Sequence, residues 1–264
     1  MSTWADERRP RPTDTRSMNS FHAFSTSHFV MLALFVAGIW PVVRLGRRYH
    51  DDPHSPAARR VSRIFAIAIP CFTIPLQLVD LLPGQYSFRS SLPLQLCDLA
   101  WIVATLALWT HHRYVVALTY YWGLVLTTQA LITPSLTTGF PSPKFIAFWG
   151  SHILIVWAAI FLVFGLGLAP RWRDYATTVA TTAAWAVTVY VFNVAASTNY
   201  GYLNAKPASA SLLDFLGPWP TYVVAEIAII ATVWALMTWP WERVRRARAA
   251  SPTPPASAPS GSSR

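Results

Sequence analysis

The sequence contains little of what marks a soluble, disulfide-bonded or metal-binding protein. Of 264 residues only 11 are acidic, charged residues of both signs make up 12%, and there are two cysteines. Because Cys71 and Cys97 both fall within long apolar runs, they favour neither a disulfide framework nor a structural metal site. The first 26 residues lack the apolar run and small-residue cleavage site of a signal peptide. We therefore predict no cofactor, no metal and no cleaved leader.

What the chain has instead is apolar and aromatic surface, with 53% hydrophobic residues and 13 tryptophans. This balance is typical of a membrane protein that crosses the bilayer several times. A net charge of +10 would indicate nucleic-acid binding in a soluble chain. Here, however, the arginines lie in short connections and tails, where they fit topology signals and contacts with lipid headgroups. The predicted partners are membrane phospholipids and not nucleic acid, and the oligomeric state stays open.

Seven windows of about 20 mostly apolar residues are long enough to cross the hydrocarbon core. Short connections join them, so the prediction is one all-α domain, a polytopic seven-transmembrane-helix bundle over residues 27–240. Residues 1–26 are predicted to form a disordered N-terminal tail, and residues 241–264 a basic and then Pro/Ser-rich disordered C-terminal tail. No internal repeat is visible in the sequence, which argues against an inverted-repeat transporter. The windows are His28–Leu45, Val61–Leu82, Leu92–Trp109, Tyr114–Thr133, Phe145–Leu168, Tyr175–Ala196 and Trp219–Trp239.

The distribution of arginine and lysine predicts the orientation. With the N-terminus outside, the segments on the inner side carry 13 of these residues, whereas the outer connections carry only Arg89, Lys144 and Lys206. The N-terminal tail, which holds four arginines, is the exception. The prediction is a multi-pass protein of the cell membrane with its N-terminus outside and its C-terminus in the cytoplasm.

In that orientation, polar residues from six predicted helices fall at one depth. At 1.5 Å per residue, Cys97 lies about 8 Å below Leu92, and His152 lies about 10 Å below Phe145. Polar groups inside a membrane are costly and usually face a protein interior or a wet cavity. The remaining members of this predicted layer are Gln77, Asp80, Gln129, Asn193, Asn199 and Glu226.

A cysteine and a histidine at matching depth indicate a nucleophile and its base. The imidazole of His152 would take the proton of the Cys97 thiol, and the resulting thiolate would attack an acyl carbonyl. Either residue alone would more often be a buried core residue, and this interpretation stays open for both. The other cysteine, Cys71, has only Thr73 as a polar neighbour and is predicted to pack in the core.

Four further polar residues of the layer have more than one interpretation. Gln95 and Asp98 lie one turn apart on a face turned about 100° from the cysteine. We expect them to bond to another helix, and Asp98 could also orient the histidine. Glu226 and Asp80 could form a proton relay or join helices through hydrogen bonds.

The outer connection Thr198–Thr221 is long and rich in Tyr, Trp and Pro. Such residues are typical of an interfacial belt, but a connection above the polar layer could equally act as a lid. We predict that its polar side chains, together with Gln129 and Asn193, meet the phosphate or ester oxygens of a lipid. The loop residues concerned are Asn199, Tyr200, Asn204 and Lys206.

Three motifs together resemble a known family: LPLQLCDLAWI at Leu92–Ile102, FWGSHILIV at Phe148–Val156, and NYGYLNAKP with GPWP between residues 199 and 220. The chain resembles the YwaF-type bacterial integral membrane proteins, which are related to the eukaryotic transmembrane acyltransferase that forms polyunsaturated ether phospholipids. The resemblance covers residues 28–239. It implies a seven-helix fold, with Cys97 at the nucleophile position and His152 in the Ser-His motif. It also implies that this chain contains the family's N-Y-x-x-L-N-x-K-P loop, which is matched by Asn199, Tyr200, Asn204, Lys206 and Pro207.

The leading functional hypothesis is a membrane-embedded acyltransferase that moves a fatty acyl group from phospholipid to a lysophospholipid-type acceptor through a Cys97 thioester, with His152 as general base. A lipid acyl hydrolase with the same Cys/His pair is the other enzyme class considered. The alternative is a non-catalytic lipid-binding protein or a proton-coupled transporter that uses Glu226, Asp80 and His152. A retinal-binding receptor is disfavoured because the only two lysines, Lys144 and Lys206, lie in connections and leave no mid-span amine for a Schiff base.

Overall fold

The computed structural model describes residues 20–250 except positions 80, 85, 90 and 208–210. The described chain is helical, apart from one isolated bridge between Ser20 and Thr138, so the predicted all-α class is confirmed. Two π-helical segments, η2 and η3, continue from α4 and α6, and two short 3₁₀ turns, η4 and η5, lie in the connection between α7 and α8. The elements are α1 (Thr26–Arg47), α2 (Pro56–Val79), α3 (Leu96–Thr110), α4 (Arg113–Tyr121), η2 (Trp122–Thr127), α5 (Thr128–Ile132), α6 (Pro143–Ile160), η3 (Phe161–Gly165), α7 (Trp172–Ala196), η4 (Tyr200–Tyr202), η5 (Leu212–Leu216) and α8 (Thr221–Ala250).

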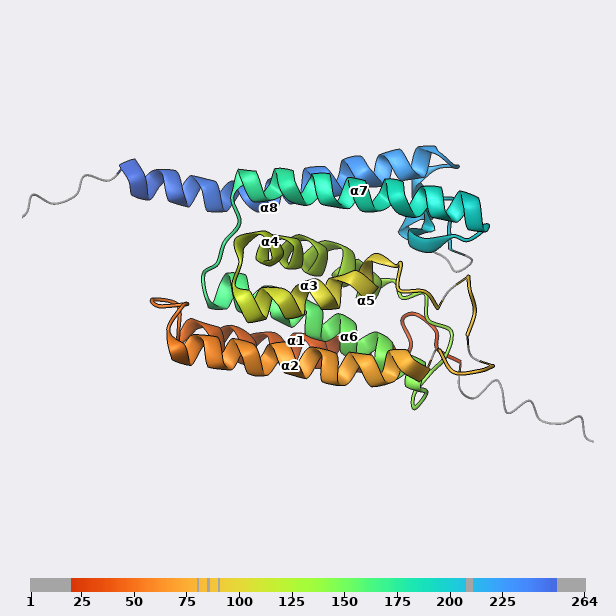
Figure 1. Ribbon diagram of the computed structural model, residues 1–264, viewed down its shortest axis with the longest axis horizontal. Helices are drawn as coiled ribbons and strands as arrows, with labels where there is room; N and C mark the ends of the chain where they lie inside the picture. The colour runs from red at the N-terminus through yellow and green to blue at the C-terminus, as the bar shows by residue number, and fades with distance from the viewer. Residues whose placement is uncertain (1–19, 80, 85, 90, 208–210, 251–264) are drawn as a thin grey trace, which may run out of the picture.

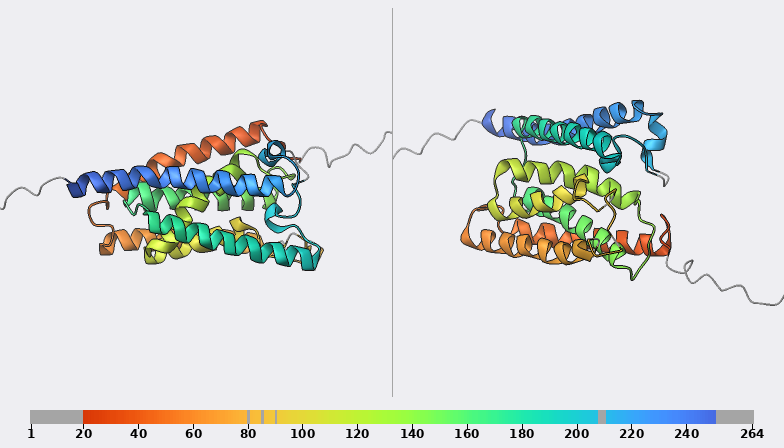
Figure 2. Two further views of the ribbon diagram at one scale, coloured as in Figure 1. Left: turned by 90° about the horizontal axis from the view of Figure 1, so that it is seen from above. Right: turned by 45° about the vertical axis from the view of Figure 1, so that its right-hand side comes forward.

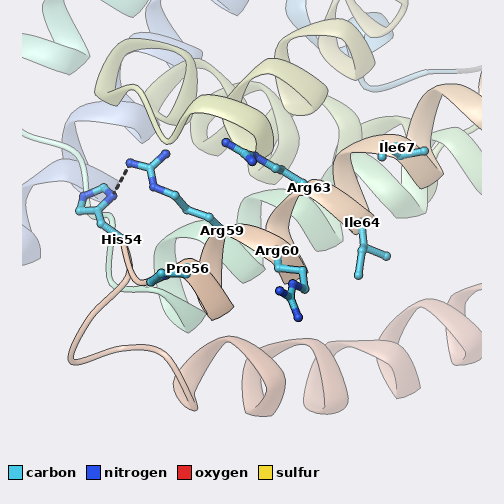
Figure 3. Close-up of a pocket in the computed structure, with 7 residues that line it drawn as sticks. All are labelled: His54, Pro56, Arg59, Arg60, Arg63, Ile64 and Ile67. Atoms are coloured by element: carbon cyan, nitrogen blue, oxygen red, sulfur yellow. Dashed lines mark hydrogen bonds between the residues drawn. The ribbon is translucent and has the colours of Figure 1, made fainter.

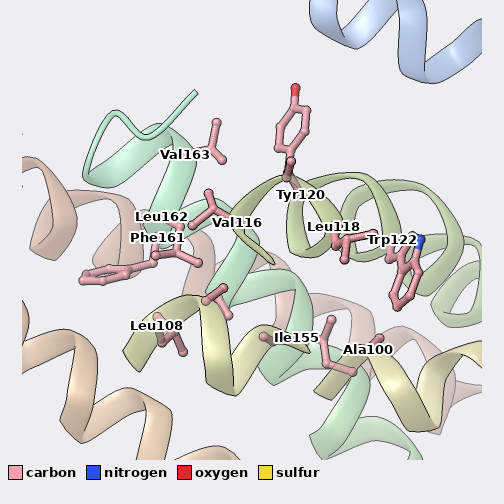
Figure 4. Packing of buried hydrophobic residues seen from close by; sticks show 14 of the residues in the cluster. Ala100, Leu108, Val116, Leu118, Tyr120, Trp122, Ile155, Phe161, Leu162 and Val163 are labelled. Atoms are coloured by element: carbon pink, nitrogen blue, oxygen red, sulfur yellow. The ribbon is translucent and has the colours of Figure 1, made fainter. Parts of the chain in front are cut away.

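The long helices lie roughly parallel to one another in layers (Figures 1 and 2). Helices α1 and α2 form one edge, α3 and α4 the middle, and α7 with α8 the opposite edge, while α6 runs through the interior. The main apolar cluster is built from α2, α3, α4, η2, α6 and η3, together with Trp234 of α8, and Figure 4 shows part of it around Ile155 and Phe161. We call the helices from α1 to η3 the α1–α6 core, and the remaining two long helices the α7–α8 pair.

Six helical stretches of the described chain are long and apolar enough to cross a membrane. Each corresponds to one predicted window, so the protein is a polytopic membrane protein. The third window is the exception, because α3 has only 15 residues and rises about 22 Å, less than the roughly 30 Å of a hydrocarbon core. The structure therefore supports six of the seven predicted crossings by length.

Helix α3 begins at Leu96, four residues later than its window. The preceding backbone is bonded to other elements: the Leu92 N–H donates to the Tyr200 hydroxyl at 3.1 Å, and the Leu94 carbonyl accepts from Trp185 Nε1 at 3.2 Å. Asp98 then caps the helix by accepting the Gln95 N–H at 3.2 Å. Its side chain satisfies a donor that a helix N-terminus otherwise leaves unpaired.

The described structure extends into both predicted tails. Phe21 is buried against the rings of Phe145 and Trp149, so the chain packs on the core before α1 begins. At the other end, α8 continues through the basic segment to Ala250. Phe21 is held by apolar contacts with residues far along the chain, and residues 241–250 continue the hydrogen bonding of α8. Neither interaction is visible in the local sequence pattern. The other tail residues lie outside the described ones.

The helices of the α1–α6 core approach one another closely at glycines. A Cβ atom added to Gly46 would lie 2.6 Å from Gly165 Cα, which is backbone that has no room to move aside. At Gly123 an added Cβ would meet Ala159 Cβ at 3.1 Å. Close-packed interiors tolerate little added volume, so these contacts bring α1 against η3 and η2 against α6.

The α7–α8 pair joins the core through apolar and polar side chains. Trp234 of α8 is buried in the main apolar cluster, and Tyr175 and Val179 of α7 pack against it. Arg113 of α4 forms an ion pair with the buried Asp174 of α7, with Nη2 to Oδ1 at 2.8 Å. Trp122 Nε1 donates to Thr182 Oγ1 at 2.9 Å. Further contacts of this kind join Tyr114 to Thr181 and Tyr121 to Thr238.

Candidate functional site

One cavity of about 660 Å³ lies between the α1–α6 core and the α7–α8 pair. It receives side chains from α2, α3, η2, α5, α6, α7 and α8, and from the connection that precedes α8. The structure thus brings together most of the polar layer expected from the sequence. The polar and titratable residues that line it include Gln77, Gln95, Cys97, Asp98, Gln129, Lys144, His152 and Glu226.

Cys97 lies in the first turn of α3 and is partly accessible from this cavity. A helix N-terminus carries partial positive charge, which stabilises a nearby thiolate. The carboxylate of Asp98 next to it has the opposite effect. Cys71, by contrast, is exposed on α2 and does not line the cavity. The prediction that it packs in the core is wrong, because its side chain lies on the outer face of that helix.

His152 of α6 is buried at the cavity wall. Its Nδ1 lies 2.7 Å from the Phe148 carbonyl oxygen. A carbonyl only accepts hydrogen bonds, so Nδ1 carries the proton and Nε2 carries the lone pair. The imidazole also stacks on the Phe148 ring, with centroids 4.2 Å apart. These contacts fix the ring and leave Nε2 as the basic atom, although no hydrogen bond joins His152 to Cys97.

Asp98 and Gln95 hold the start of α3 in place. Asp98 Oδ1 accepts from Gln77 Nε2 of α2 at 3.3 Å, so its expected bond to another helix is present. Gln95 Oε1 accepts the Gly201 N–H at 2.9 Å and ties α3 to the connection before α8. The Nδ1 atom of His152 is bonded to the carbonyl of Phe148 in its own helix, so an orienting role of Asp98 stays a prediction.

Asn193 organises the connection that follows α7. Its Nδ2 donates to the Tyr200 carbonyl and to Asn204 Oδ1, at 2.8 and 2.9 Å. Its Oδ1 accepts from Thr198 Oγ1 and from the Tyr200 N–H, both at 2.8 Å. Asn199 makes three comparable bonds, to the Asn204 N–H and to both backbone groups of Ala205. These amides are saturated by their own loop and do not line the cavity.

Tyr200 and Lys206 likewise bond to the protein and lie outside the cavity lining. The fully buried Tyr200 hydroxyl donates to the Phe88 carbonyl at 2.6 Å. Lys206 lies 3.9 Å from Asp214 and 5.6 Å from the Tyr222 ring centroid. In the structure, the side chains of the predicted lipid-contacting loop residues therefore bond to the protein and hold the loop in its conformation. Neighbouring residues of the same connection line the cavity: Gly201, Tyr202, Leu203, Pro207, Ser211 and Leu213.

Glu226 and Gln129 do line the cavity, as expected. Within the described part of the chain, the Glu226 carboxyl has no hydrogen bond or ion pair with another side chain. A carboxyl group placed this way in a membrane protein is usually functional. The remaining predicted residue, Asp80, lies outside the described residues.

The sequence-based prediction missed the apolar part of the cavity. Below Glu226 the wall continues along α8 to Trp234, eight residues and about 12 Å further. Small residues of α7, including Ala183 and Ala186, line the cavity as well. Apolar residues in a membrane helix give no signal that separates a cavity wall from a lipid-facing surface, so only the packing reveals this compartment.

The described residues contain no group of three or more His, Cys, Asp or Glu side chains that could hold a metal ion. The chemistry available in the cavity is that of a thiol, an imidazole with a free lone pair, two carboxyl groups, an amine, and several amides and hydroxyl groups.

Comparison with known proteins gave one family. The model of the TMEM164 family matches residues 23–238, which covers all of the cavity-lining residues. A search of curated proteins and a search of solved structures each returned no match.

Proposed function

The chain belongs to the TMEM164 family, and from this membership and the cavity we propose that it is a membrane-embedded acyltransferase that acts on phospholipids. The observation that carries the proposal is the joint placement of Cys97 and His152 on the wall of one cavity. The orientation of the imidazole supports the same role, because Nε2 bears the lone pair needed to accept a thiol proton.

The proposed reaction has two half-steps. His152 Nε2 takes the proton of Cys97, and the thiolate attacks the ester carbonyl of a phospholipid. A C–S bond forms, the ester C–O bond breaks, and the departing alcohol receives the proton from His152. A lysophospholipid hydroxyl then attacks the thioester carbonyl while His152 accepts its proton, and the released thiolate is reprotonated. No oxidant or nucleotide enters this balance.

The two compartments of the cavity fit the two parts of a lipid. The apolar section between Glu226 and Trp234 accommodates about 12 Å of acyl chain. The polar section near Cys97 holds the glycerol and ester groups, where Gln129 and Glu226 offer hydrogen bonds. Asn193, Asn199, Tyr200 and Asn204 act indirectly, by holding the connection that covers the cavity.

We also propose where the protein lies and how it is oriented in the membrane. The basic connections favour a cell-membrane protein with its N-terminus outside, which would open the Cys97 end of the cavity toward the outer leaflet. The relationship to the YwaF-type bacterial proteins rests on the three motifs alone.

Acyl exchange by purified protein in phosphatidylcholine nanodiscs tests the proposal. With labelled phospholipid donor and lysophospholipid acceptor, we expect Cys97→Ala to lower the rate at least 1,000-fold, and His152→Gln to lower it at least 100-fold. The matched control is Cys71→Ala, which removes the exposed cysteine and leaves the rate unchanged. Transfer by Cys97→Ala at the wild-type rate would refute the thioester mechanism.

A second function, proton-coupled transport or lipid binding without catalysis, is favoured by one observation, the unpaired carboxyl group of Glu226 on the cavity wall. In that case Glu226→Gln would abolish lipid flux or binding, and Cys97→Ala would have no effect. The acyltransferase proposal predicts the reverse order of sensitivity for acyl exchange.

A further inference from the structure

A second cavity of about 510 Å³ lies on the surface of α2, at the end of the bundle opposite Cys97. The placement follows from the antiparallel packing of α2 and α3. Gln77, late in α2, bonds to Asp98 beside the cysteine, whereas Ser62, early in α2, bonds to His111 after the end of α3 at 2.8 Å. The lining residues are His54, Pro56, Arg59, Arg60, Arg63, Ile64 and Ile67 (Figure 3). We call this feature the arginine groove.

The arginine groove is charged at one end and apolar at the other. Arg60, Ile64 and Ile67 follow the i, i+4, i+7 pattern of one helix face, with Arg59 and Arg63 flanking it. Ile64 and Ile67 are 63% and 52% exposed. From Arg60 to Ile67 the helix rises about 10 Å. A headgroup and the first part of an acyl chain have this same sequence of a charged and then an apolar segment.

The positive charge of the arginine groove is not neutralised by the described residues. None of its three arginines forms an ion pair, whereas Arg113 and Arg245, at the same end of the bundle, contact carboxylates at 2.8 and 3.0 Å. Arg59 donates to His54 Nδ1 at 3.4 Å, and the Arg63 guanidinium lies 5.3 Å from the Trp109 ring centroid. Neither contact cancels charge.

The charge of the arginine groove contributes to a lowered pKa of the nearby His111. Burial, with the nearby Arg59 and His54, lowers the pKa of its imidazole from 6.5 to about 4. An anion bound among the arginines would offset part of that effect. The N-terminus of α2, at Pro56, adds partial positive charge to the same site.

We propose that the arginine groove binds an anionic phospholipid, with its phosphate among Arg59, Arg60 and Arg63 and one acyl chain along Ile64 and Ile67. The exposed isoleucines favour a lipid over a soluble phosphate, because an anion alone would leave them uncovered. Arginine guanidinium groups match phosphate geometry through paired N–H donors. The site shares no residue with the Cys97 cavity, and the proposal is independent of acyl transfer.

Lipid retention tests the proposal. Full-length protein in detergent is incubated with equal amounts of phosphatidylglycerol and phosphatidylcholine, and bound lipids are counted by native mass spectrometry. Wild type is expected to retain phosphatidylglycerol at least tenfold over phosphatidylcholine. Replacing Arg59, Arg60 and Arg63 together by Gln is expected to remove that preference, since each arginine near a headgroup contributes about fivefold to anionic-lipid affinity.

The matched control removes the same charge from α8. The triple change Arg243→Gln, Arg246→Gln and Arg248→Gln should keep the preference within twofold of wild type. Equal loss in both triple variants would overturn the arginine groove as a specific site. The single variant Arg60→Gln alters an exposed side chain and keeps the test valid if the triple variant does not fold. It should lower the preference severalfold, and an unchanged preference would count against the site.

The apolar half of the arginine groove separates a lipid from a soluble anion. Replacing Ile64 and Ile67 by Ser should weaken retention of phosphatidylglycerol at least threefold. Glycerophosphate in tenfold excess should not displace the lipid from wild type. Full displacement by glycerophosphate, with no effect of the isoleucine changes, would identify a soluble-anion site and refute the lipid assignment.

Discussion

Helix α6, inside the α1–α6 core, and helix α8, in the α7–α8 pair, have comparable hydropathy but very different packing. The spans containing α6 and α8 have mean hydropathies of 2.2 and 1.7, yet 61% of the first is buried and only 17% of the second. The core is held by interlocking apolar side chains and close glycine contacts. The pair is held by the buried Trp234 and its partly buried apolar neighbours, by one ion pair and by several hydroxyl and indole bonds. Hydropathy therefore identifies membrane segments but not the tightness of their packing.

Because of this difference, the cavity has one wall formed by the tightly packed α6 and its neighbours and a second wall formed by the less buried α7–α8 pair. Cys97 and His152 belong to the core, where their positions are fixed by packing and by capping bonds. The wall across the cavity, including Glu226, belongs to the pair. A lipid that enters the cavity would displace the α7–α8 side at lower cost than the core side.

The largest effect is expected where the core itself is disrupted. Gly46→Val would place a Cβ atom 2.6 Å from Gly165 Cα and add two methyl groups to it, and should lower the free energy of unfolding by about 3 kcal/mol. Denaturant unfolding in detergent measures the change. The control Ala180→Val, at an exposed position of α7, should stay within about 0.5 kcal/mol of wild type. Equal stabilities would show that the close α1–η3 contact is absent.

Removing the ion pair tests the attachment of the α7–α8 pair. Arg113→Gln leaves the Asp174 carboxylate, which is 8% exposed, without its cation, and should cost about 2 kcal/mol because the arginine itself is half-exposed. Amide exchange should rise in α7 more than in α6. Arg173→Gln, on an exposed side chain nearby, is the control. Uniform exchange in both helices would contradict a separately attached pair.

Acid should weaken the core end that contains His111. Its pKa of about 4 lies below the unfolded value of 6.5, so the unfolded chain binds more protons between these values. Stability is complete above pH 6.5 and is lost as the pH falls toward 4, by about 1–2 kcal/mol at pH 5. His111→Asn keeps a residue suited to the left-handed backbone at this position (φ 54°) and should remove this pH dependence. A slope unchanged by that substitution would assign the effect to other groups.

The smallest change in stability is expected for a substitution in the cavity wall. Its effect is measured as a change in acyl-chain-length selectivity. Ala231→Leu adds three carbons to the apolar section lined by α8. If the proposed acyl transfer holds, preference should shift by two or more carbons toward shorter chains, while stability changes by less than about 1 kcal/mol. Ala228→Leu, on the exposed face of α8, should leave the profile unchanged. If Ala231→Leu and wild type have the same acyl-chain preference, the acyl chain does not bind in this section of the cavity.

The sequence alone was sufficient to predict the membrane class and six of the membrane-crossing helices, and it placed Cys97 and His152 at one depth. Apolar length sets which segments cross the bilayer, and a fixed rise per residue sets the depth of each polar side chain. Both quantities are local. The capping role of Asp98 and the bond from Gln95 to Gly201 depend on contacts between segments distant in the chain, so no local pattern could distinguish them from contacts with a ligand.

Only the tertiary structure assigned Asn193, Asn199 and Tyr200 to the bracing of a loop, and only it separated the tightly packed core from the α7–α8 pair. A polar side chain in a sequence offers the same donors and acceptors to a lipid, a neighbouring helix or its own backbone. Which of these it meets is decided when the chain closes on itself, because a buried polar group must be satisfied by whatever partner the packing brings within hydrogen-bonding distance.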